Sequence, residues 1–293
     1  MEIECVVDAK AQLGESPVWD AEAQALWWVD IPACRLHRFD PSSGRDESFE
    51  LPAPIGCLAL REQGGVLVAL KSGLHLFEPA SGRLKLVEPP PFSHRDDRFN
   101  DGRCDRQGRF WVSSMRDPQD PDAKAGQFFR FDPGHGLRPM ISGLITGNGL
   151  AFSPDSRTMY MSDSHASVQT IWAWDYDQSD GSIANRRVFA TTRDLGGRPD
   201  GAAVDEDGCY WTAANSGWQL VRLTPQGTVD RTIELPIARP TMLAFGGREL
   251  DIIYVTSMRP QPDDPQGDDQ PHAGGLFALS AGIKGLPEPR WTG

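Results

Sequence analysis

Six short segments with the same order of polar and apolar residues recur along the chain. Each begins with a polar or small residue and continues into a short apolar stretch. The segments are ESPVW from Glu15, GCLAL from Gly56, NDGRC from Asn100, NGLAF from Asn148, DGAAV from Asp200 and TMLAF from Thr241. The shortest intervals, from Glu15 to Gly56 and from Asp200 to Thr241, are 41 residues, and the longest, from Asn148 to Asp200, is 52. Such a period is typical of β-propeller blades of four strands each.

A second, more strongly apolar strand follows each opening segment, as in LWWVD (26–30) and CYWTA (209–213). These strands are rich in Val, Ile, Tyr and Trp, and turns such as SPDS and DEDG precede them. Third strands such as QTIWAWD and weaker outer strands complete each unit. The pattern predicts an all-β fold, a six-bladed β-propeller with four strands per blade, as one domain over residues 1–293. A β-sandwich of similar strands is the alternative.

The last blade lacks an outer strand after GGLFAL, which begins at Gly274. The N-terminal segment ECVVD, from Glu4 to Asp8, can supply that strand. The sequence therefore predicts that the N-terminal strand joins the last blade and closes the ring, which removes an exposed sheet edge. The polar stretch of residues 260–271 interrupts this blade and is predicted to be a loop, with a lid near the channel mouth as the alternative.

Charge and cysteine usage narrow the classes of function. The formal net charge of -12 argues against nucleic acid as a partner, because phosphate binding requires a basic face. Five scattered cysteines without a CxxC pair predict no disulfide framework and favour a reducing compartment. The sequence shows neither a signal peptide nor an apolar run of about 20 residues, so no membrane association is predicted. These features predict a cytoplasmic protein and leave protein partners open.

The opening residues of the blades are candidate metal ligands. The first strand of each propeller blade lines the central channel, so Glu15, Asn100, Asn148 and Asp200 are expected to converge there. Each alone would be an ordinary turn or surface residue, but they share one register in the repeat. Buried carboxylates also require a counter-ion. Glu15, Asn148 and Asp200 are therefore predicted to bind one divalent metal ion. Oxygen ligands suit Ca²⁺, Mg²⁺ or Mn²⁺, with Zn²⁺ and Fe²⁺ as alternatives.

Longer motifs carry a resemblance to a known family. The motifs are LGESPVWD (13–20), WWVDI (27–31), RFNDGRCDRQGRFW (98–111), NGLAFSPDSRTMYMSDS (148–164), RPDGAAVDEDGCYW (198–211) and FGGRELDIIYVTS (245–257). In order and spacing they resemble the gluconolactonase, senescence-marker and luciferin-regenerating family of six-bladed propellers. The resemblance covers nearly the whole chain and implies a metal-dependent lactonase.

The resemblance also implies roles for individual residues. The residues that match the family's metal ligands are Glu15, Asn148 and Asp200. The residues that match its substrate-contacting motif are Arg98, Asn100 and Asp101. A further family carboxylate has Asp122 as its candidate counterpart, although the surrounding loop MRDPQDPDAKAG is too irregular for a secure match.

The resemblance therefore implies hydrolysis of a sugar (aldono-) lactone to the corresponding aldonic acid in carbohydrate catabolism, with the small-molecule lactone as partner. Asp200 is the predicted catalytic residue, as a general base beside the metal. The sequence contains no GxSxG or HExxH motif, so neither a serine triad nor a zinc-protease site is predicted. The alternatives are a metal-dependent propeller esterase or phosphotriesterase and a non-enzymatic calcium-binding propeller.

Gluconolactone, galactonolactone, xylonolactone and arabinonolactone differ in hydroxyl stereochemistry, which the loops are expected to select. Several arginines are expected near the active end of the channel, mostly as surface charges. The alternative is that one or two of them bind an anionic substituent of the substrate, such as a carboxylate, phosphate or sulfonate. These arginines are Arg95, Arg103, Arg116, Arg198 and Arg259.

Overall fold

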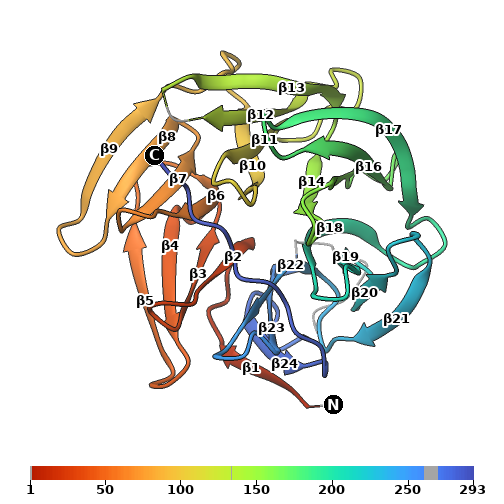
Figure 1. Cartoon of the computed structure of the whole chain (residues 1–293). Coiled ribbons are helices and arrows are strands. Elements are labelled where there is room, and N and C mark those ends of the chain that lie inside the picture. Colours follow the sequence, from red (N-terminus) through yellow and green to blue (C-terminus); the bar gives the residue numbers. More distant parts are fainter. Residues whose placement is uncertain (1, 133, 261–269) are drawn as a thin grey trace.

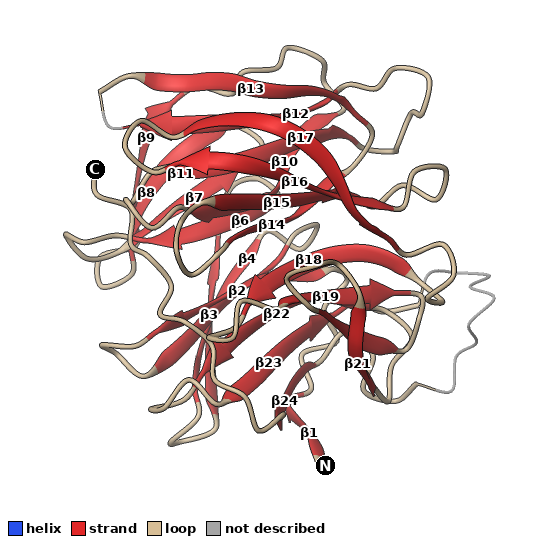
Figure 2. Ribbon diagram, turned by 45° about the vertical axis from the view of Figure 1, so that its right-hand side comes forward, coloured by secondary structure: helices blue, strands red, loops and turns tan. Residues whose placement is uncertain are grey.

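The computed structural model describes residues 2–132, 134–260 and 270–293. They form six antiparallel sheets of four strands each, and the sheets stand as blades around a central axis (Figure 1). The described residues form strands, turns and loops without a helix (Figure 2). The part of the chain that the structure describes therefore contains no helix long and apolar enough to cross a membrane. The predicted six-bladed β-propeller is confirmed.

The innermost strand of each blade is the segment that opens the sequence repeat. These strands are buried along nearly their whole length, because they face both the channel and the neighbouring blades. The inner strands are β2 (Gly14–Asp20), β6 (Ile55–Leu60), β10 (Asp97–Cys104), β14 (Gly147–Phe152), β18 (Arg198–Val204) and β22 (Pro240–Gly246).

Burial decreases from the axis outward. The second strands are β3 (Ala25–Asp30), β7 (Val66–Leu70), β11 (Phe110–Arg116), β15 (Thr158–Asp163), β19 (Tyr210–Asn215) and β23 (Ile252–Ser257). The third strands are β4 (Arg35–Asp40), β8 (Gly73–Glu78), β12 (Gly126–Asp132), β16 (Thr170–Asp177), β20 (Gln219–Leu223) and β24 (Leu276–Ser280). The outer strands, which are largely exposed or half-buried, are β1 (Ile3–Val7), β5 (Arg45–Glu50), β9 (Arg83–Glu88), β13 (Gly136–Leu144), β17 (Ser182–Thr191) and β21 (Val229–Glu234).

The N-terminal strand closes the ring. β1 pairs antiparallel with β24, with Ile3 opposite Leu279 and Cys5 opposite Phe277. The sheet order is therefore β1-β24-β23-β22, and the predicted closure is confirmed. The predicted loop of residues 260–271, with its alternative as a lid, falls mostly on residues 261–269, which lie outside the described residues.

Large aromatic side chains fill the space between blades. Trp28, Trp111 and Trp211 lie on three different second strands and are at most 1% exposed. Trp111 contacts Phe152 of the next blade, with ring centroids 6.2 Å apart. Fully buried aromatic rings contribute much of the core's stability, so these tryptophans hold the blades together and are unavailable to a ligand.

The C-terminal segment covers one end of the ring, and its blue trace crosses the centre in Figure 1. Gly285 bridges Asp205, just after β18, and Trp291 bridges Arg61, just after β6. The Trp291 ring is 4% exposed and stacks on Phe131 at 5.5 Å. The segment therefore covers the end at which inner strands finish, and the end at which they begin is left for ligands.

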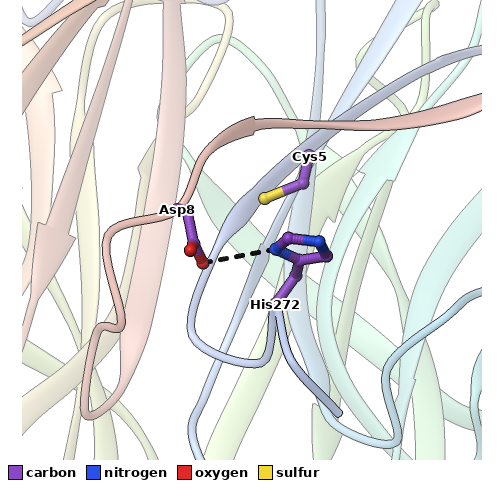
Figure 3. A group of neighbouring side chains, drawn as sticks. All are labelled: Cys5, Asp8 and His272. Carbon is purple, nitrogen blue, oxygen red and sulfur yellow. Dashed lines mark ion pairs between the residues drawn. The ribbon is translucent and has the colours of Figure 1, made fainter.

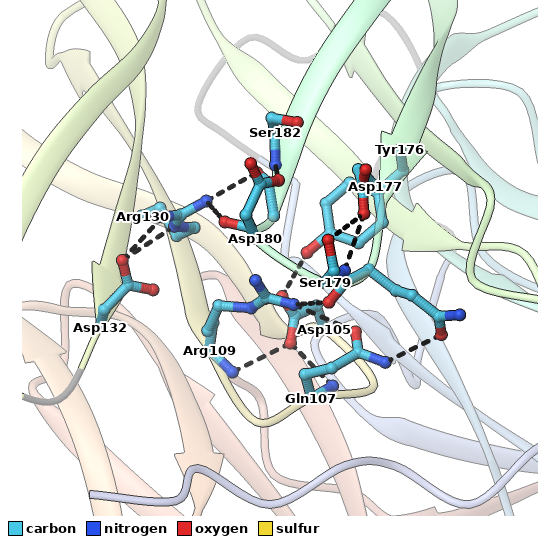
Figure 4. Close-up of polar contacts among 12 residues, drawn as sticks. Asp105, Gln107, Arg109, Arg130, Asp132, Tyr176, Asp177, Ser179, Asp180 and Ser182 are labelled. Carbon is cyan, nitrogen blue, oxygen red and sulfur yellow. Dashed lines mark hydrogen bonds and ion pairs between the residues drawn. The ribbon is translucent and has the colours of Figure 1, made fainter.

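A buried carboxylate joins two neighbouring blades (Figure 4). Asp105, just after β10, is fully buried. Its Oδ2 accepts a hydrogen bond from Arg109 Nε at 2.7 Å and another from the hydroxyl of Tyr176 on β16. Its Oδ1 accepts the backbone N–H groups of Gln107 and Arg109 at 2.9 and 3.0 Å. Burial and the Asp105 charge raise the pKa of Tyr176, so its hydroxyl stays protonated and donates.

We expect Tyr176→Phe to lower the free energy of unfolding by about 1.5–3 kcal/mol, because a hydrogen bond to a buried carboxylate is lost. Urea unfolding followed by tryptophan fluorescence measures this loss. Tyr254→Phe is the matched control, since Tyr254 is also buried and burial alone accounts for its raised pKa. Equal losses in both variants would show that the Asp105 contact contributes nothing specific.

Candidate metal centre and substrate cavity

Each inner strand carries a β-bulge at the residue that opens the sequence repeat. The pairing with the second strand shifts register between Glu15 and Val18 and between Asn148 and Ala151. In the other blades the shifts lie between Ile55 and Cys57, Phe99 and Gly102, Pro199 and Ala202, and Pro240 and Met242. Bulges bend a strand and redirect a side chain. Ser16, directly after Glu15, has a φ of 49°, which fits this local distortion. The bulges thus turn the opening side chains toward the channel.

A cavity of about 160 Å³ lies at the end of the channel where the inner strands begin. It is lined by five of the predicted site residues, which are Glu15, Arg98, Asn100, Asn148 and Asp200. The sequence analysis missed most of the other lining residues, which are Leu13, Met115, Gln119, Thr146, Ser164, Arg198, Asn215 and Met258. Among these, only Arg198 was considered, as a candidate anion-binding residue.

The missed polar residues have a recognisable position in the fold. Asn215 ends β19 and lies opposite Arg198 in the antiparallel register. Ser164 directly follows β15, whose last residue lies opposite Gly147. In an antiparallel hairpin the end of the second strand lies beside the start of the first. These two lining residues could therefore have been predicted from the sequence, by taking the polar residue at the end of each second strand.

A continuous chain of hydrogen bonds crosses the cavity wall toward Asp200. Arg98 Nη1 donates to Asn100 Oδ1 at 2.8 Å, and Asn100 Nδ2 donates to Asn148 Oδ1 at 2.8 Å. Asn148 Nδ2 then donates to Asp200 Oδ1 at 2.8 Å. Each donor fixes the orientation of the next amide, so Arg98 directs an N–H group of Asn148 toward the carboxylate.

The other oxygen of Asp200 is held in the same way from the opposite side. Asn215 Nδ2 donates to Asp200 Oδ2 at 2.8 Å, and Arg198 Nη2 donates to Asn215 Oδ1 at 3.0 Å. Asp200 is thus the acceptor at the meeting point of two chains, each of which begins at an arginine. Both of its oxygens are fixed in position, which is the preorganisation a reacting carboxylate requires.

Carboxylates of like charge lie on the cavity lining and directly behind it. Glu15 and Asp200 are each 8% exposed, and Asp101 is 4% exposed. Burial, followed by the charges of Asp200 and Asp101, raises the pKa of Glu15 well above its ordinary value. Burial also raises the pKa of Asp200 to about 7, against the opposing effect of Arg198. The ionised forms of these groups are therefore unfavourable without a cation between them.

The residues fit a divalent metal ion. Glu15 Oε2 accepts the backbone N–H of Ser16 at 2.9 Å, and Oε1 has no hydrogen-bond partner among the described residues. Asn148 and Asp200 add an amide and a carboxylate from adjacent inner strands. Hard oxygen ligands of this kind are those preferred by Ca²⁺, Mg²⁺ and Mn²⁺, and a cation would offset the burial and like-charge repulsion that raise the pKa values of Glu15 and Asp200.

Asp101 and Asp122 are not among the described residues that line the cavity. The Asp101 side chain is buried behind the lining of the cavity, where its Oδ2 accepts the N–H of Leu150 at 3.1 Å. Asp122 is exposed in a loop. From that loop it is Gln119 that lines the cavity, while Asp117 pairs with Arg98 at 2.7 Å. The bulge of β10 explains the position of Asp101, because it spans Phe99 to Gly102.

A second group of potential metal ligands lies on the last blade (Figure 3). Cys5, Asp8 and His272 place one ligand atom each within 4.8 Å of one another. Asp8 is already paired with Lys10 Nζ at 2.7 Å and with His272 Nδ1 at 3.5 Å. These partners lower the pKa of Asp8, and the lysine ammonium already compensates its charge. The channel cavity is the better metal site.

Fold and cavity together define a class of protein, a six-bladed β-propeller with an oxygen-lined cavity at one end of its channel. The family model described as "SMP-30/Gluconolactonase/LRE-like region" matches residues 13–259. The chain belongs to this family, and the resemblance seen in its motifs is confirmed.

Individual relatives match the full length. The chain is 43% identical over 293 residues to a 6-deoxy-6-sulfogluconolactonase from Pseudomonas putida, with 99% of each chain covered. It is 32% identical over 298 residues to regucalcin from Xenopus laevis, covering 100% of this chain and 99% of the relative. The solved structure of a calcium-binding protein, regucalcin, from Agrobacterium tumefaciens is similar with a TM-score of 0.92 at 27% identity, covering 98% and 96%.

The metal-free protein is expected to lose stability as the pH rises. Because the pKa of Asp200 is raised to about 7, the folded chain keeps a proton that the unfolded chain releases near pH 4. The free energy of unfolding therefore falls as the pH rises through this window. We expect chelator-treated protein to melt at least about 4 °C lower at pH 8 than at pH 5, as measured by differential scanning fluorimetry.

Asp200→Asn provides the comparison for this experiment, because asparagine is neutral at both pH values. The decline in melting temperature between pH 5 and pH 8 should be smaller in the variant than in the parent protein. An identical decline in the two proteins would assign the pH dependence to other groups.

Proposed function

We propose that the protein hydrolyses an aldonolactone to the aldonic acid, with a divalent metal ion held by Glu15, Asn148 and Asp200. One observation carries the proposal: two buried carboxylates of raised pKa face one cavity, which also contains an asparagine hydrogen-bonded to one of them. The name of the Pseudomonas putida relative, a sulfogluconolactonase, supports a sugar lactone as substrate class.

Asp200 is the general base of the proposed reaction. It accepts a proton from the attacking water while the water oxygen adds to the lactone carbonyl carbon. It then returns the proton to the ring oxygen as the ester C–O bond breaks, so that lactone and water give one hydroxy acid. A divalent cation bound in the cavity supplies Lewis-acid polarisation of the carbonyl and lowers the pKa of water. Asn148 and Asn215 keep the carboxylate aligned for both proton transfers.

Arg98 and Asn100 bind the sugar hydroxyls in this proposal. Arg98 is fixed by Asp117, by the carbonyl of Phe99 and by Asn100. Its Nη2 group has no hydrogen-bond partner among the described residues and would bind a hydroxyl. Asn100 Oδ1 accepts one hydrogen bond from Arg98 and has a second lone pair to offer. In this proposal Asp101, behind the cavity lining, does not touch substrate, and its charge adds to the burial and the Asp200 charge that raise the pKa of Glu15.

A calcium-binding propeller without catalysis is the second candidate function. It is favoured by the likeness to the Agrobacterium tumefaciens structure, which is described as a calcium-binding protein. A binding protein would need the oxygen ligands but would not need Asp200 clamped by two oriented amides. We also propose that residues 1–293 act as one domain in the cytoplasm, which the five free cysteines support.

A lactone panel tests the proposal. Purified protein, supplied with each divalent ion in turn, is assayed with a pH indicator against glucono-, galactono-, xylono- and arabinonolactone, and against aryl esters and phosphotriesters. Hydrolysis of lactones well above the spontaneous rate, with weak or no ester turnover, is the expected result. Metal binding without hydrolysis of any ester would favour the calcium-binding function, and preferential phosphotriester turnover would identify a different hydrolase.

A further inference from the structure

Only one of the five arginines considered as anion-binding candidates lines the active cavity, and it is Arg198. Arg95 has a side chain 90% exposed, beside Asp96. Arg116 is ion-paired with Asp97, with Nε and Oδ1 2.9 Å apart. The charges of these two residues are therefore hydrated or compensated outside the cavity.

The remaining two candidates lie at other places in the fold. Arg103 donates to the carbonyl of Ala202 at 2.9 Å and lies 3.5 Å from Glu288 of the C-terminal segment. Arg259 lines a separate hollow together with Lys10. Neither residue is among those that line the cavity with Asp200, so both are excluded from substrate recognition.

Arg198 differs from Arg98, the other arginine of the cavity, because it forms no ion pair with a carboxylate of the described residues. Arg98 is ion-paired with Asp117 at 2.7 Å. Arg198 is half-buried, and its hydrogen bond among the described residues goes from Nη2 to the neutral amide of Asn215. Its Nε and Nη1 groups have no hydrogen-bond partner there. A guanidinium with free donors on a fixed fork is suited to bind an anion with two or three oxygens.

We propose that Arg198 binds an anionic substituent on the lactone, a sulfonate, phosphate or carboxylate carried away from the reacting carbonyl. The inference rests on the proposed lactonase function and specifies its substrate class. Arg198 and Asp200 are two residues apart on β18, and both side chains line the cavity. A substrate whose carbonyl lies at Asp200 therefore directs another of its groups toward Arg198.

Charge balance explains why the anion must be held by this residue. Glu15 and Asp200 on the cavity lining repel a negative substituent, and Asp101 behind the lining adds to this effect. Arg198 is the cation of the cavity whose charge no described carboxylate compensates by an ion pair. An asparagine or glutamine at this position would bind neutral hydroxyls as well as Arg198 does, without burying a charge.

The test compares lactones that differ in one group. The substrates are glucono-1,5-lactone and its analogues with a sulfonate, phosphate or carboxylate at the terminal carbon. For each, kcat/KM is measured with metal-supplied parent protein, Arg198→Met, Arg198→Lys and the control Arg248→Met. Arg248 is exposed on the β22–β23 turn, at the opposite end of the channel, and its replacement removes the same charge.

The parent protein should prefer at least one anionic lactone over the neutral one. Arg198→Met should lower this preference by about 10- to 100-fold, the usual effect of losing a hydrogen bond to a charged group, mainly through a higher KM. Arg198→Lys should retain part of the preference, and Arg248→Met should retain all of it. The order of kcat/KM among the sulfonate, phosphate and carboxylate analogues identifies which anion the Arg198 guanidinium binds.

Two results separate failure of this inference from failure of the proposed function. Hydrolysis of the neutral lactone with no preference for any anionic analogue, or a preference that Arg198→Met leaves intact, overturns the role of Arg198 and leaves the lactonase function standing. Absence of hydrolysis for every lactone overturns the proposed function and the inference with it.

Discussion

Asp200→Asn is expected to lower kcat/KM for lactone hydrolysis by at least about 10³-fold while the propeller remains folded. General-base catalysis alone contributes roughly 10²–10⁴-fold, and the carboxylate is also a proposed metal ligand. Asparagine has the same shape as aspartate, so hydrogen bonding to Asn215 and packing against the bulge of β18 can persist.

The same substitution should leave the metal-free fold at least as stable as the parent at neutral pH. The pKa of Asp200 is raised mainly by burial, which means that its charge is held at a cost in the absence of a cation. Loss of activity together with equal or higher melting temperature is the pattern of a residue kept for function rather than for stability.

The measurement is an initial-rate assay with a pH indicator, paired with a melting curve of each protein. Glu249→Gln is the matched control, because Glu249 is exposed and pairs with Lys284 beyond the opposite end of the channel. The control should retain its rate within about twofold. An Asp200→Asn protein with near-parental kcat/KM would remove Asp200 as general base.

The blade architecture could be predicted because the sequence repeat consists of local patterns of residue types. Apolar inner strands, aromatic second strands and Gly- or Asp-rich turns recur with a period that four-stranded blades share. The N-terminal closure followed from counting strands in the last blade. Both expectations needed only the alternation and spacing of residue types, which are properties of a linear sequence.

The site was predictable to the extent that its residues share the first strand of the repeat. Glu15, Asn148 and Asp200 occupy one register, and the β-bulges of their strands bring all three to the cavity. Asn215 was missed because its position depends on antiparallel pairing with Arg198, which is a relation across a hairpin. Asp101 follows Asn100 directly, yet the bulge of β10 places it behind the lining.

The orientation of the asparagine side-chain amides could not be predicted from the sequence, for a different reason. Asn100, Asn148 and Asn215 each have a carbonyl and an amino end, and either end can face Asp200. In the structure, Arg98 and Arg198 bind the carbonyl ends of Asn100 and Asn215. Only the assembled ring of blades brings these arginines and amides together, so the roles of donor and acceptor follow from tertiary structure.

Removal of the metal is expected to abolish hydrolysis, with less than about 1% of the rate remaining, because Lewis-acid activation of carbonyl and water is worth several kcal/mol. Protein dialysed against a chelator should regain activity when a divalent ion is restored. Titration of Ca²⁺, Mg²⁺, Mn²⁺ and Zn²⁺ separately, with the rate and the melting temperature as the two measurements, gives a half-activation concentration for each ion.

Glu15→Gln separates metal binding from the proton transfer assigned to Asp200. Glutamine keeps an oxygen but loses the charge, so the metal concentration for half-activation should rise at least about 10-fold, in line with the effect of altered ligand surroundings. At saturating metal the rate should recover more fully in Glu15→Gln than in Asp200→Asn, since the base is intact. If chelated protein keeps its full rate, or if Glu15→Gln binds metal as the parent does, then the buried acidic pair performs its chemistry without a cation between its oxygens.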